Sequence, residues 1–449
     1  MKVLSLPIEE VMDITGNQPI TDCVSRKSSF CYELKVEDGF ILFNTLTKEC
    51  LLIEKSEYYG ESIKDVLFEK WFYVPSDFDE LQFVDDLRNI FLCTLHQTPG
   101  IKGYTILPTT DCNARCFYCF EANSKKKSMS DDVANRVVEY IDKTHRRDSK
   151  VSISWFGGEP LYNVKAINII CSGLKSKNIN FRSSMVSNGY LFDTEIIGEA
   201  KELWNLNRVQ ITLDGTEKTY NKVKAYIYDG VNAFERVLCN IDNLLSSEID
   251  VSIRLNIDAY NMKDMCCLVE GLATRYKGRK GLSVYSHPLF EEVGKCGGFV
   301  RTHERRKEIC ESQKLLDEKI VSLGLNNSSY VINKSFMNHY CMADSYDEIV
   351  VLPDGHLTKC ESCLDGNYVG HIDDATLNED MLAKYSKHCD KLEECKICPL
   401  YPECIRLEVC HDAKKCHKEF RDKKIADIEA YIRNEYKSYL ERQKKDESV

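Results

Sequence analysis

The sequence predicts an α/β fold that contains a parallel sheet. From about Lys102 onward, short apolar stretches alternate with amphipathic helical patterns, and six strands are expected at residues 104–107, 151–156, 185–187, 209–213, 251–257 and 282–285. Strands and helices that alternate in this way form parallel sheets, because each helix crosses over to the next strand. With 449 residues, of which 43% are apolar, the chain is long enough for two or three domains with hydrophobic cores.

The helices of this core show their buried faces in the sequence. Between the first two strands, Ser130 is placed to cap a helix whose apolar residues recur at helical spacing: Val133, Val137, Tyr140 and Ile141. A long helical pattern at about 302–323 leads out of the core. A final amphipathic helix carries Ile425, Ile428, Ile432 and Tyr436 on one face.

A small α+β unit is expected ahead of the core, within residues 1–95. Short strands are predicted between Phe30 and Ile53, with turns at Asp38-Gly39 and at residues 44–48. Helical patterns follow at about 62–71 and 77–95. The order of strands and then helices distinguishes this unit from the alternating pattern that begins near Lys102.

Composition and charge argue against several classes of partner. A net charge of −11 disfavours a broad nucleic-acid surface, and no stretch approaches about 18 continuous apolar residues, so neither nucleic acid nor membrane is expected. Residues 1–15 lack the basic and apolar regions of an export signal, which predicts a cytoplasmic protein with reduced cysteines. Eight of the 22 cysteines lie in apolar patterns and are expected to be buried: Cys23, Cys31, Cys50, Cys93, Cys171, Cys239, Cys266 and Cys267.

The loop after the first core strand carries three cysteines, Cys112, Cys116 and Cys119, spaced C-x3-C-x2-C. Three thiolates leave one iron of a [4Fe–4S] cube without a protein ligand, and that iron can bind S-adenosylmethionine (SAM). A zinc site would need a fourth ligand nearby, yet no further Cys or His lies between Thr109 and Ser130. This spacing, with the aromatic Tyr118 before the last cysteine, resembles the signature of the radical SAM superfamily.

The resemblance implies a fold and a chemistry. Six βα units resemble the partial (β/α)6 TIM-like barrel of that superfamily, expected here at residues 96–300, in which reactive groups gather at the carboxyl ends of the strands. The implied cofactors are SAM and a [4Fe–4S] cluster with an open iron. An electron from a reductant such as ferredoxin or flavodoxin would cleave SAM to a 5′-deoxyadenosyl radical, which then abstracts hydrogen from the substrate.

The same resemblance points to SAM contacts at the ends of later strands. After the second strand, Gly157, Gly158, Glu159 and Pro160 match the GGEP motif that binds the amino group of SAM, and two glycines allow a close backbone approach. Ser187 and Asn188 follow the third strand and resemble a T-N-G element. Asp214 follows the fourth strand, where it either contacts the SAM ribose or caps a turn.

The fifth strand carries Arg254 and Asn256, which are two residues apart and therefore share one side of the strand. By resemblance Arg254 is expected to hold the SAM carboxylate; a structural ion pair is the alternative. No catalytic acid, base or radical donor can be named. Tyr285, His287 and Glu291 follow the sixth strand near the expected cavity, where we expect them to form a packed rim rather than to take part in catalysis.

The C-terminal part is rich in cysteines. Cys341, Gly355 and Cys360 agree with the C-x(9–15)-G-x4-C element of SPASM domains, with a hairpin turn expected at Pro353-Asp354-Gly355. The resemblance implies a domain at residues 338–449 that follows a bridging helix at 301–337. It also implies two auxiliary [4Fe–4S] clusters, one held by Cys395, Cys398, Cys404 and Cys416, the other by Cys341, Cys360 and Cys410. Cys410 and Cys416 depart from the family spacing.

The fourth ligand of the second auxiliary cluster is not assigned, because residues 334–340, where the family often places it, contain no cysteine. Cys310, Cys363 and Cys389 are candidates, and an open iron that binds a substrate thiolate is the alternative.

Radical SAM proteins with SPASM domains commonly modify peptides or proteins. The unit at residues 1–95 resembles the winged-helix-like domain with which some of them recognise a leader peptide. We therefore expect a peptide maturase that forms a thioether or another cross-link on a precursor peptide. The alternatives are an anaerobic sulfatase-maturating, formylglycine-generating enzyme and a non-catalytic iron–sulfur protein that binds partners or carries electrons.

Overall fold

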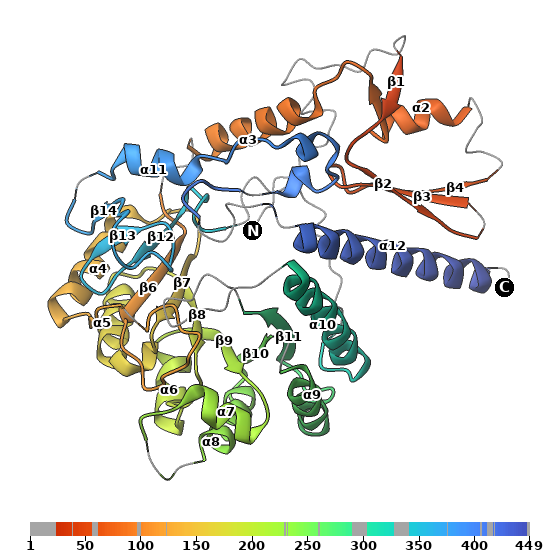
Figure 1. Ribbon diagram of the computed structural model, residues 1–449. Helices are drawn as coiled ribbons and strands as arrows, with labels where there is room; N and C mark the ends of the chain where they lie inside the picture. Colours follow the sequence, from red (N-terminus) through yellow and green to blue (C-terminus); the bar gives the residue numbers. More distant parts are fainter. Residues whose placement is uncertain are drawn as a thin grey trace.

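The computed structural model describes residues 24–37, 39–55, 62–96, 100–122, 124–228, 230, 232–258, 261–289, 303–326, 341–374, 376–404, 406–410, 416 and 418–446. Its centre is a nine-stranded sheet in the order β11-β10-β9-β8-β7-β6-β12-β13-β14 (Figure 1). A three-stranded sheet, β2-β3-β4, and a two-stranded sheet, β1-β5, lie in the N-terminal unit.

Six parallel strands form most of the central sheet and confirm the expected core. They are β6 (Gly103–Thr109), β7 (Val151–Gly157), β8 (Phe181–Ser187), β9 (Leu206–Leu213), β10 (Asp250–Ile257) and β11 (Leu282–Pro288). The helices between them are α4 (Asp131–Thr144), the short η1 (Pro160–Asn163), α5 (Val164–Ser176), α6 (Thr194–Glu202), α7 (Glu217–Lys224), α8 (Ala233–Ser246) and α9 (Met262–Tyr276). Because all six strands run the same way, the loops after them meet at one edge of the sheet.

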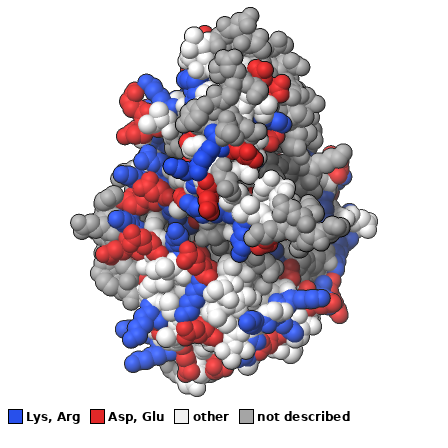
Figure 2. Space-filling model, turned by 90° about the vertical axis from the view of Figure 1, so that its right-hand side faces the viewer, with Lys and Arg blue, Asp and Glu red and all other residues white. Residues whose placement is uncertain are grey.

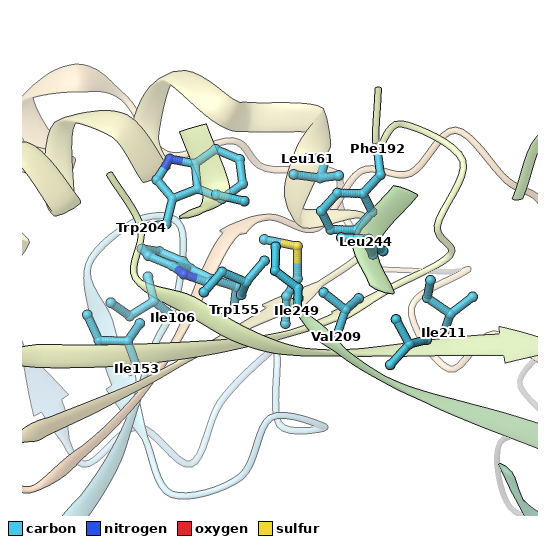
Figure 3. Packing of buried hydrophobic residues seen from close by; sticks show 14 of the residues in the cluster. Ile106, Ile153, Trp155, Leu161, Phe192, Trp204, Val209, Ile211, Leu244 and Ile249 are labelled. Carbon is cyan, nitrogen blue, oxygen red and sulfur yellow. The ribbon is translucent and has the colours of Figure 1, made fainter. Parts of the chain in front are cut away.

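The core lies between this sheet and its helices. Trp155 of β7 and Trp204 are fully buried there, and the indole nitrogen of Trp204 donates a hydrogen bond to Asn168 Oδ1 at 2.6 Å (Figure 3). At the start of α4, Ser130 Oγ accepts a hydrogen bond from the Val133 amide at 3.2 Å, so the expected cap is confirmed. The apolar face of α4 that the sequence predicts is buried.

The C-terminal region extends the central sheet. Strand β12 (Glu348–Val351) pairs in parallel with β6, and β13 (His356–Thr358) and β14 (Gly370–His371) continue the sheet in antiparallel fashion. The hairpin expected at residues 353–355 is therefore present, and Gly355 has a φ of 86° there. The sequence analysis did not predict that this hairpin joins the core sheet. The remaining elements are α10 (His303–Ser322), α11 (Glu379–Ser386), η3 (Glu393–Ile397), η4 (Tyr401–Glu403) and α12 (Lys418–Asp446).

The N-terminal unit contains the expected strands and helices. Strands β2 (Cys31–Lys35), β3 (Gly39–Asn44) and β4 (Cys50–Glu54) form an antiparallel sheet, followed by α2 (Ser62–Glu69) and α3 (Glu80–His96). Strands β1 (Ser25–Lys27) and β5 (Tyr73–Pro75) were not predicted, because three residues are too few for a periodic signal. Asp38 of the expected first turn lies outside the described residues. The winged-helix-like character of this unit and the domain bounds stay predictions.

The N-terminal unit packs against the C-terminal region of the chain. Tyr401 lies in one apolar cluster with Phe30, Trp71 and Phe83. In a second cluster, Ile428 and Ile432 of α12 pack with Leu34, Ile41 and Phe43, which places α12 along the sheet β2-β3-β4 (Figure 1). Of the apolar face expected on the last helix, Ile428 and Ile432 are thus buried and Ile425 and Tyr436 are partly buried against the sheet β2-β3-β4.

The prediction that eight cysteines are buried was partly wrong. Cys31 and Cys171 are buried and Cys266 is partly buried, whereas Cys50, Cys239 and Cys267 are exposed. Cys50 begins the outer strand β4, and Cys239 and Cys267 lie on the outward faces of α8 and α9, which explains their exposure. Cys23 and the side chain of Cys93 lie outside the described residues.

The described surface mixes charges of both signs. In the face shown in Figure 2, lysine and arginine side chains alternate with aspartate and glutamate. Within the described ranges, no helix has both the length and the apolar character needed to cross a membrane.

Candidate active site at the carboxyl edge of the sheet

The three-cysteine loop leaves β6 and lies at the carboxyl edge of the sheet. The Cys119 amide donates to the Cys116 carbonyl at 3.1 Å, which forms a tight turn between these two ligand candidates. The loop is also anchored to the chain around the end of α7. The Arg115 amide donates to the Lys224 carbonyl at 2.7 Å, and the Ile227 amide donates to the Asn113 carbonyl at 3.0 Å.

The three cysteines are partly buried and lie near enough to one another for their charges to interact. Burial raises the pKa of the Cys112 thiol to about 12, and the neighbouring Glu159, Cys116 and Cys119 contribute to the increase. Burial also raises the pKa of Cys116 and Cys119. Thiols in such a setting ionise when a cationic metal group binds them, so their chemistry fits an iron–sulfur cluster. In the described part of the chain, no three His, Cys, Asp or Glu side chains converge on the point that one metal ion would occupy.

Two glycines allow the end of β7 to approach this loop. Gly157 has a φ of 112°, and a Cβ atom there would lie 2.3 Å from the Thr109 carbonyl oxygen. A Cβ on Gly158 would lie 2.2 Å from the Asp111 carbonyl oxygen. Both distances are too short for any side chain, so the backbone contact between β7 and the cysteine loop requires glycine at both positions.

Glu159 is fully buried beside the loop. Its carboxylate accepts hydrogen bonds from the Leu161 amide at 3.2 Å, Ser187 Oγ at 2.9 Å and the Asn188 amide at 2.8 Å. Burial raises the pKa of Glu159 to about 7, although these donors oppose the increase. A carboxylate held in this way gains from a nearby cation, and the ammonium group of SAM fits that requirement. Pro160 follows as the first residue of η1.

Ser187 and Asn188 connect Glu159 to the cysteine loop. The side-chain amide of Asn188 donates to Asn113 Oδ1 at 2.7 Å and lies 3.8 Å from Cys112 Sγ. Asn113 is fully buried, and its Nδ2 atom has no hydrogen-bond partner in the described structure. A buried donor of this kind costs free energy unless something accepts its hydrogen bond. It is therefore available to a ligand bound at this loop.

The other predicted contacts form one network across the ends of β9, β10 and β11. Tyr118 donates its hydroxyl hydrogen to Asp214 Oδ2 at 2.9 Å, and Asn256 Nδ2 donates to Asp214 Oδ1 at 3.1 Å. Arg254 Nε donates to Asn256 Oδ1 at 3.1 Å, and its NH2 group lies 2.9 Å from His287 Nδ1. The structure thus brings these predicted residues together, while their roles toward SAM stay predictions.

Lys224 is part of this network and was not predicted. Its Nζ atom lies 3.0 Å from Asp214 Oδ2 and donates to the Tyr118 hydroxyl at 3.2 Å, and its side chain is only 4% exposed. Its charge also lowers the pKa of Cys116 against the effect of burial. No pattern in the sequence points to this residue, because a lysine at the end of a short helix is ordinarily exposed to solvent.

Glu121 is a second buried group that the sequence analysis missed. It is 2% exposed, and neither carboxylate oxygen has a hydrogen-bond partner in the described structure. Burial raises its pKa to about 7, with Lys126 opposing the increase. Its place two residues after Cys119 was the only available signal.

The residues expected at the rim of the cavity lie on or follow the sixth strand, β11. Tyr285 donates its hydroxyl hydrogen to Gln210 Oε1 at 2.6 Å, and burial and Arg254 lower the pKa of His287 to about 4. Both side chains therefore contact residues of other strands, Tyr285 through Gln210 and His287 through Arg254. Glu291 lies outside the described residues.

The C-terminal cysteines form two groups, and the cysteines within each group are neighbours. Cys398 and Cys404 both have Cys395 and Cys416 as close electrostatic neighbours. These four form the first set that the sequence predicts. Cys341 neighbours Cys360 and Cys410, which form the second set.

The first set lies against the N-terminal unit. Arg88 of α3 donates hydrogen bonds to the carbonyl oxygens of Tyr401 at 2.9 Å and Cys404 at 3.0 Å. Tyr401 in turn donates to Asp85 Oδ1 at 2.9 Å. Thr45 and Lys48 contact Pro399 and Glu403 from the β3–β4 turn. Residues of the first hundred positions thus hold the backbone that carries the last cysteines.

Part of the chain matches a known protein family. Residues 106–266 match the Radical SAM superfamily, and this stretch includes the cysteine loop, Glu159, Asp214 and Arg254. The match runs from β6 to α9, so the part of the chain that carries the candidate site is similar to a family that uses a [4Fe–4S] cluster and SAM.

Individual relatives match part of the chain. An uncharacterized protein of Methanocaldococcus jannaschii is 31% identical over 121 residues, which cover 26% of this chain and 40% of the relative. The radical SAM cyclopropyl synthase TigE of Paramaledivibacter caminithermalis is 24% identical over 219 residues, 45% of each chain. The matches thus span less than half the length of these relatives.

Solved structures share the fold. The structure of anSMEcpe with bound AdoMet is 18% identical with a TM-score of 0.57, and the match covers 74% of this chain and 99% of that chain. Streptococcus suis SuiB bound to the precursor peptide SuiA is 13% identical with a TM-score of 0.54, covering 88% of this chain and 98% of that chain. At these identities the likeness concerns the fold alone.

Proposed function

We propose that the chain is a radical SAM peptide maturase that installs a thioether or another cross-link on a ribosomally made precursor peptide. The observation that carries this proposal is the N-terminal unit, which packs directly on the C-terminal cysteine region through Arg88 and Tyr401. A separate folded unit at this place suits a substrate with a leader segment to be held apart from the reacting segment. The likeness to peptide-bound SuiB, over 88% of the chain, supports the same assignment.

The residues have distinct parts in this proposal. Cys112, Cys116 and Cys119 would hold a [4Fe–4S] cluster that binds SAM, and the cluster and SAM would supply a 5′-deoxyadenosyl radical with one electron from a reductant such as ferredoxin or flavodoxin. Glu159, supported by Ser187 and Asn188, orients the SAM amino group. The hydrogen-bonded residues Tyr118, Asp214, Arg254 and Asn256 would contact other parts of SAM, with Arg254 at its carboxylate. The C-terminal cysteines hold two auxiliary clusters in a SPASM domain, and the protein works in the cytoplasm.

A sulfatase-maturating activity is the second candidate. The observation in its favour is the likeness to the sulfatase maturase anSMEcpe, which covers 99% of that chain. The likeness covers only 74% of this chain, so it leaves more of the chain unexplained than the likeness to SuiB does.

The test is an anaerobic assay of the reconstituted chain with SAM, dithionite and the peptide encoded beside its gene. We expect 5′-deoxyadenosine and a peptide product that is lighter by two hydrogens per link. A product that reacts with a hydrazide probe contains an aldehyde and would favour formylglycine formation. The Cys116→Ala variant should give neither product. Peptide of unchanged mass, despite formation of 5′-deoxyadenosine, would contradict the maturase proposal for that peptide.

A further inference from the structure

Two of the C-terminal cysteines share one turn. Cys360 and Cys363 follow β13, and the Cys363 amide donates a hydrogen bond to the Cys360 carbonyl at 3.0 Å. The Cys363 thiol lies 3.2 Å from the Gly366 carbonyl, so its sulfur is on the inner side of the loop at residues 360–366. The two-residue spacing and this turn are typical of paired metal ligands, because both sulfurs then point from one loop to the same centre.

Two further cysteines face this turn. Cys360 has Cys341 and Cys363 as electrostatic neighbours, and these neighbours help to raise the pKa of its thiol to about 12, with burial as the largest cause. Cys341 in turn neighbours Cys410. The four residues come from three separate segments: the loop before β12, the loop after β13 and the segment after Leu407. These segments thus bring the four thiols within range of one another's charges in neighbouring pairs: Cys360 with Cys341 and Cys363, and Cys341 with Cys410.

Tyr385 of α11 lies beside two of these thiols. Its side chain is 3% exposed, and its hydroxyl lies 3.1 Å from Thr358 Oγ1 and donates to the Asn367 carbonyl at 3.2 Å. Cys360 and Cys363 contribute to the raised pKa of Tyr385, so this phenol lies against both thiols. A buried aromatic side chain beside a metal site lowers the local polarity, which tunes the redox potential of a bound cluster.

We propose that Cys363 is the fourth protein ligand of the auxiliary [4Fe–4S] cluster held by Cys341, Cys360 and Cys410. This inference rests on the proposed function, which assigns auxiliary clusters to the C-terminal region. It adds that this cluster has four thiolate ligands and no open iron, so a substrate thiolate does not bind there. Ligation releases the Cys363 proton and ends its contact with Gly366, and no oxidation or reduction of the thiol is involved.

The other candidates lie on different elements. Cys310 is buried on α10, which packs against α9, β11 and α12. Cys389 lies after α11, where its amide donates to the Arg406 carbonyl at 2.6 Å. Because Cys389 is also a partly buried cysteine of the same region, Cys389→Ser is the matched control for Cys363→Ser.

The experiment uses the full chain with Cys112, Cys116 and Cys119 changed to alanine, so that only auxiliary clusters bind iron. Iron, acid-labile sulfide and the electron paramagnetic resonance (EPR) spectrum of the reduced protein are measured after anaerobic reconstitution. We expect about eight iron atoms per chain in this background, and in the Cys363→Ser variant either about four fewer or the spectrum of a three-iron cluster. The Cys389→Ser variant should match the background.

A second measurement detects an open iron directly, and it remains informative if the serine variant loses the cluster. Cyanide labelled with carbon-13 is added, and its hyperfine coupling is sought in the reduced background protein. We expect no coupling there, because all four irons have thiolate ligands. Coupling in the background protein would overturn the inference, as would full iron content with an unchanged spectrum in Cys363→Ser. A background protein that binds no iron would overturn the premise of auxiliary clusters instead.

Discussion

Two cysteine regions of the chain are held in different ways. The first is the three-cysteine loop at residues 112–119, called the SAM loop below, and the second is the C-terminal region from Cys341 to Cys416. The SAM loop is fixed by its own neighbours in the barrel-like core: glycines at the end of β7 contact its backbone, and Lys224 of α7 lies beneath it. The segment from Cys395 to Cys404 is fixed by residues that begin the chain, above all Arg88 and the cluster around Phe30 and Trp71. The first site thus depends on local βα units, and the second depends on contacts between the two ends of the sequence.

The largest expected effect concerns the buried ion pair beneath the SAM loop. Lys224→Met leaves the Asp214 carboxylate, which is 3% exposed, without its cation and should lower the free energy of unfolding by about 3–5 kcal/mol. Urea unfolding of the cluster-free chain measures this change. Lys165→Met removes an exposed pair with Asp131 and should cost less than about 1 kcal/mol. Equal effects of the two substitutions would show that the core does not depend on the buried pair.

The second prediction concerns how stability depends on pH through His287, which contacts Arg254 in the same network as Asp214. His287 has a pKa of about 4 in the folded chain and the usual value of 6.5 when unfolded. Between these values the unfolded chain binds more protons, so stability should fall by about 3 kcal/mol as the pH decreases from 6.5 to 4. Urea unfolding of wild type and His287→Asn over this range should show that the variant loses less. Parallel pH profiles would contradict the prediction.

The third prediction tests the glycine contact that positions the SAM loop. Gly158→Ala places a Cβ 2.2 Å from the Asp111 carbonyl oxygen, and the resulting displacement should slow SAM cleavage about 100-fold, equivalent to about 2.7 kcal/mol. Formation of 5′-deoxyadenosine measures the effect. Gly198→Ala on α6 is the control, because its Cβ meets nothing within 4 Å and helix propensity favours alanine. Normal cleavage by Gly158→Ala would mean that the loop does not need this approach.

The smallest effect is expected at the contact between the two ends of the chain. Arg88→Ala removes two hydrogen bonds to the carbonyls of Tyr401 and Cys404 and should cost about 2 kcal/mol in stability. It should also weaken iron binding by the set containing Cys404, while the spectrum of the SAM cluster stays unchanged. Iron content and EPR spectra measure both. Arg433→Ala, an exposed residue paired with Glu429, is the control. Loss of the SAM cluster instead would remove the distinction between the two regions.

Two kinds of feature could be predicted from the sequence: elements that form a repeating pattern along the chain, and side chains that lie at the end of a strand. The six core strands, the Ser130 cap and the gathering of Glu159, Asn188, Asp214 and Arg254 follow from alternation of strands and helices, because parallel strands end at one edge. Lys224 was not predictable, since its burial depends on how α7 packs on the cysteine loop. The contacts of Arg88 were not predictable either, because nothing in local periodicity indicates which distant carbonyl a side chain reaches.

The pairing of β12 with β6 has a consequence for the order of events during synthesis. The open edge of β6 can find its partner only after the ribosome has released residues 348–351, although every other parallel strand of the core has been made by then. Until that moment the strand that leads into the SAM loop has one unpaired side. An iron–sulfur cluster inserted before that moment would meet a loop whose supporting strand is incompletely paired, so we expect the loop to gain its full support only once residues 348–351 are available.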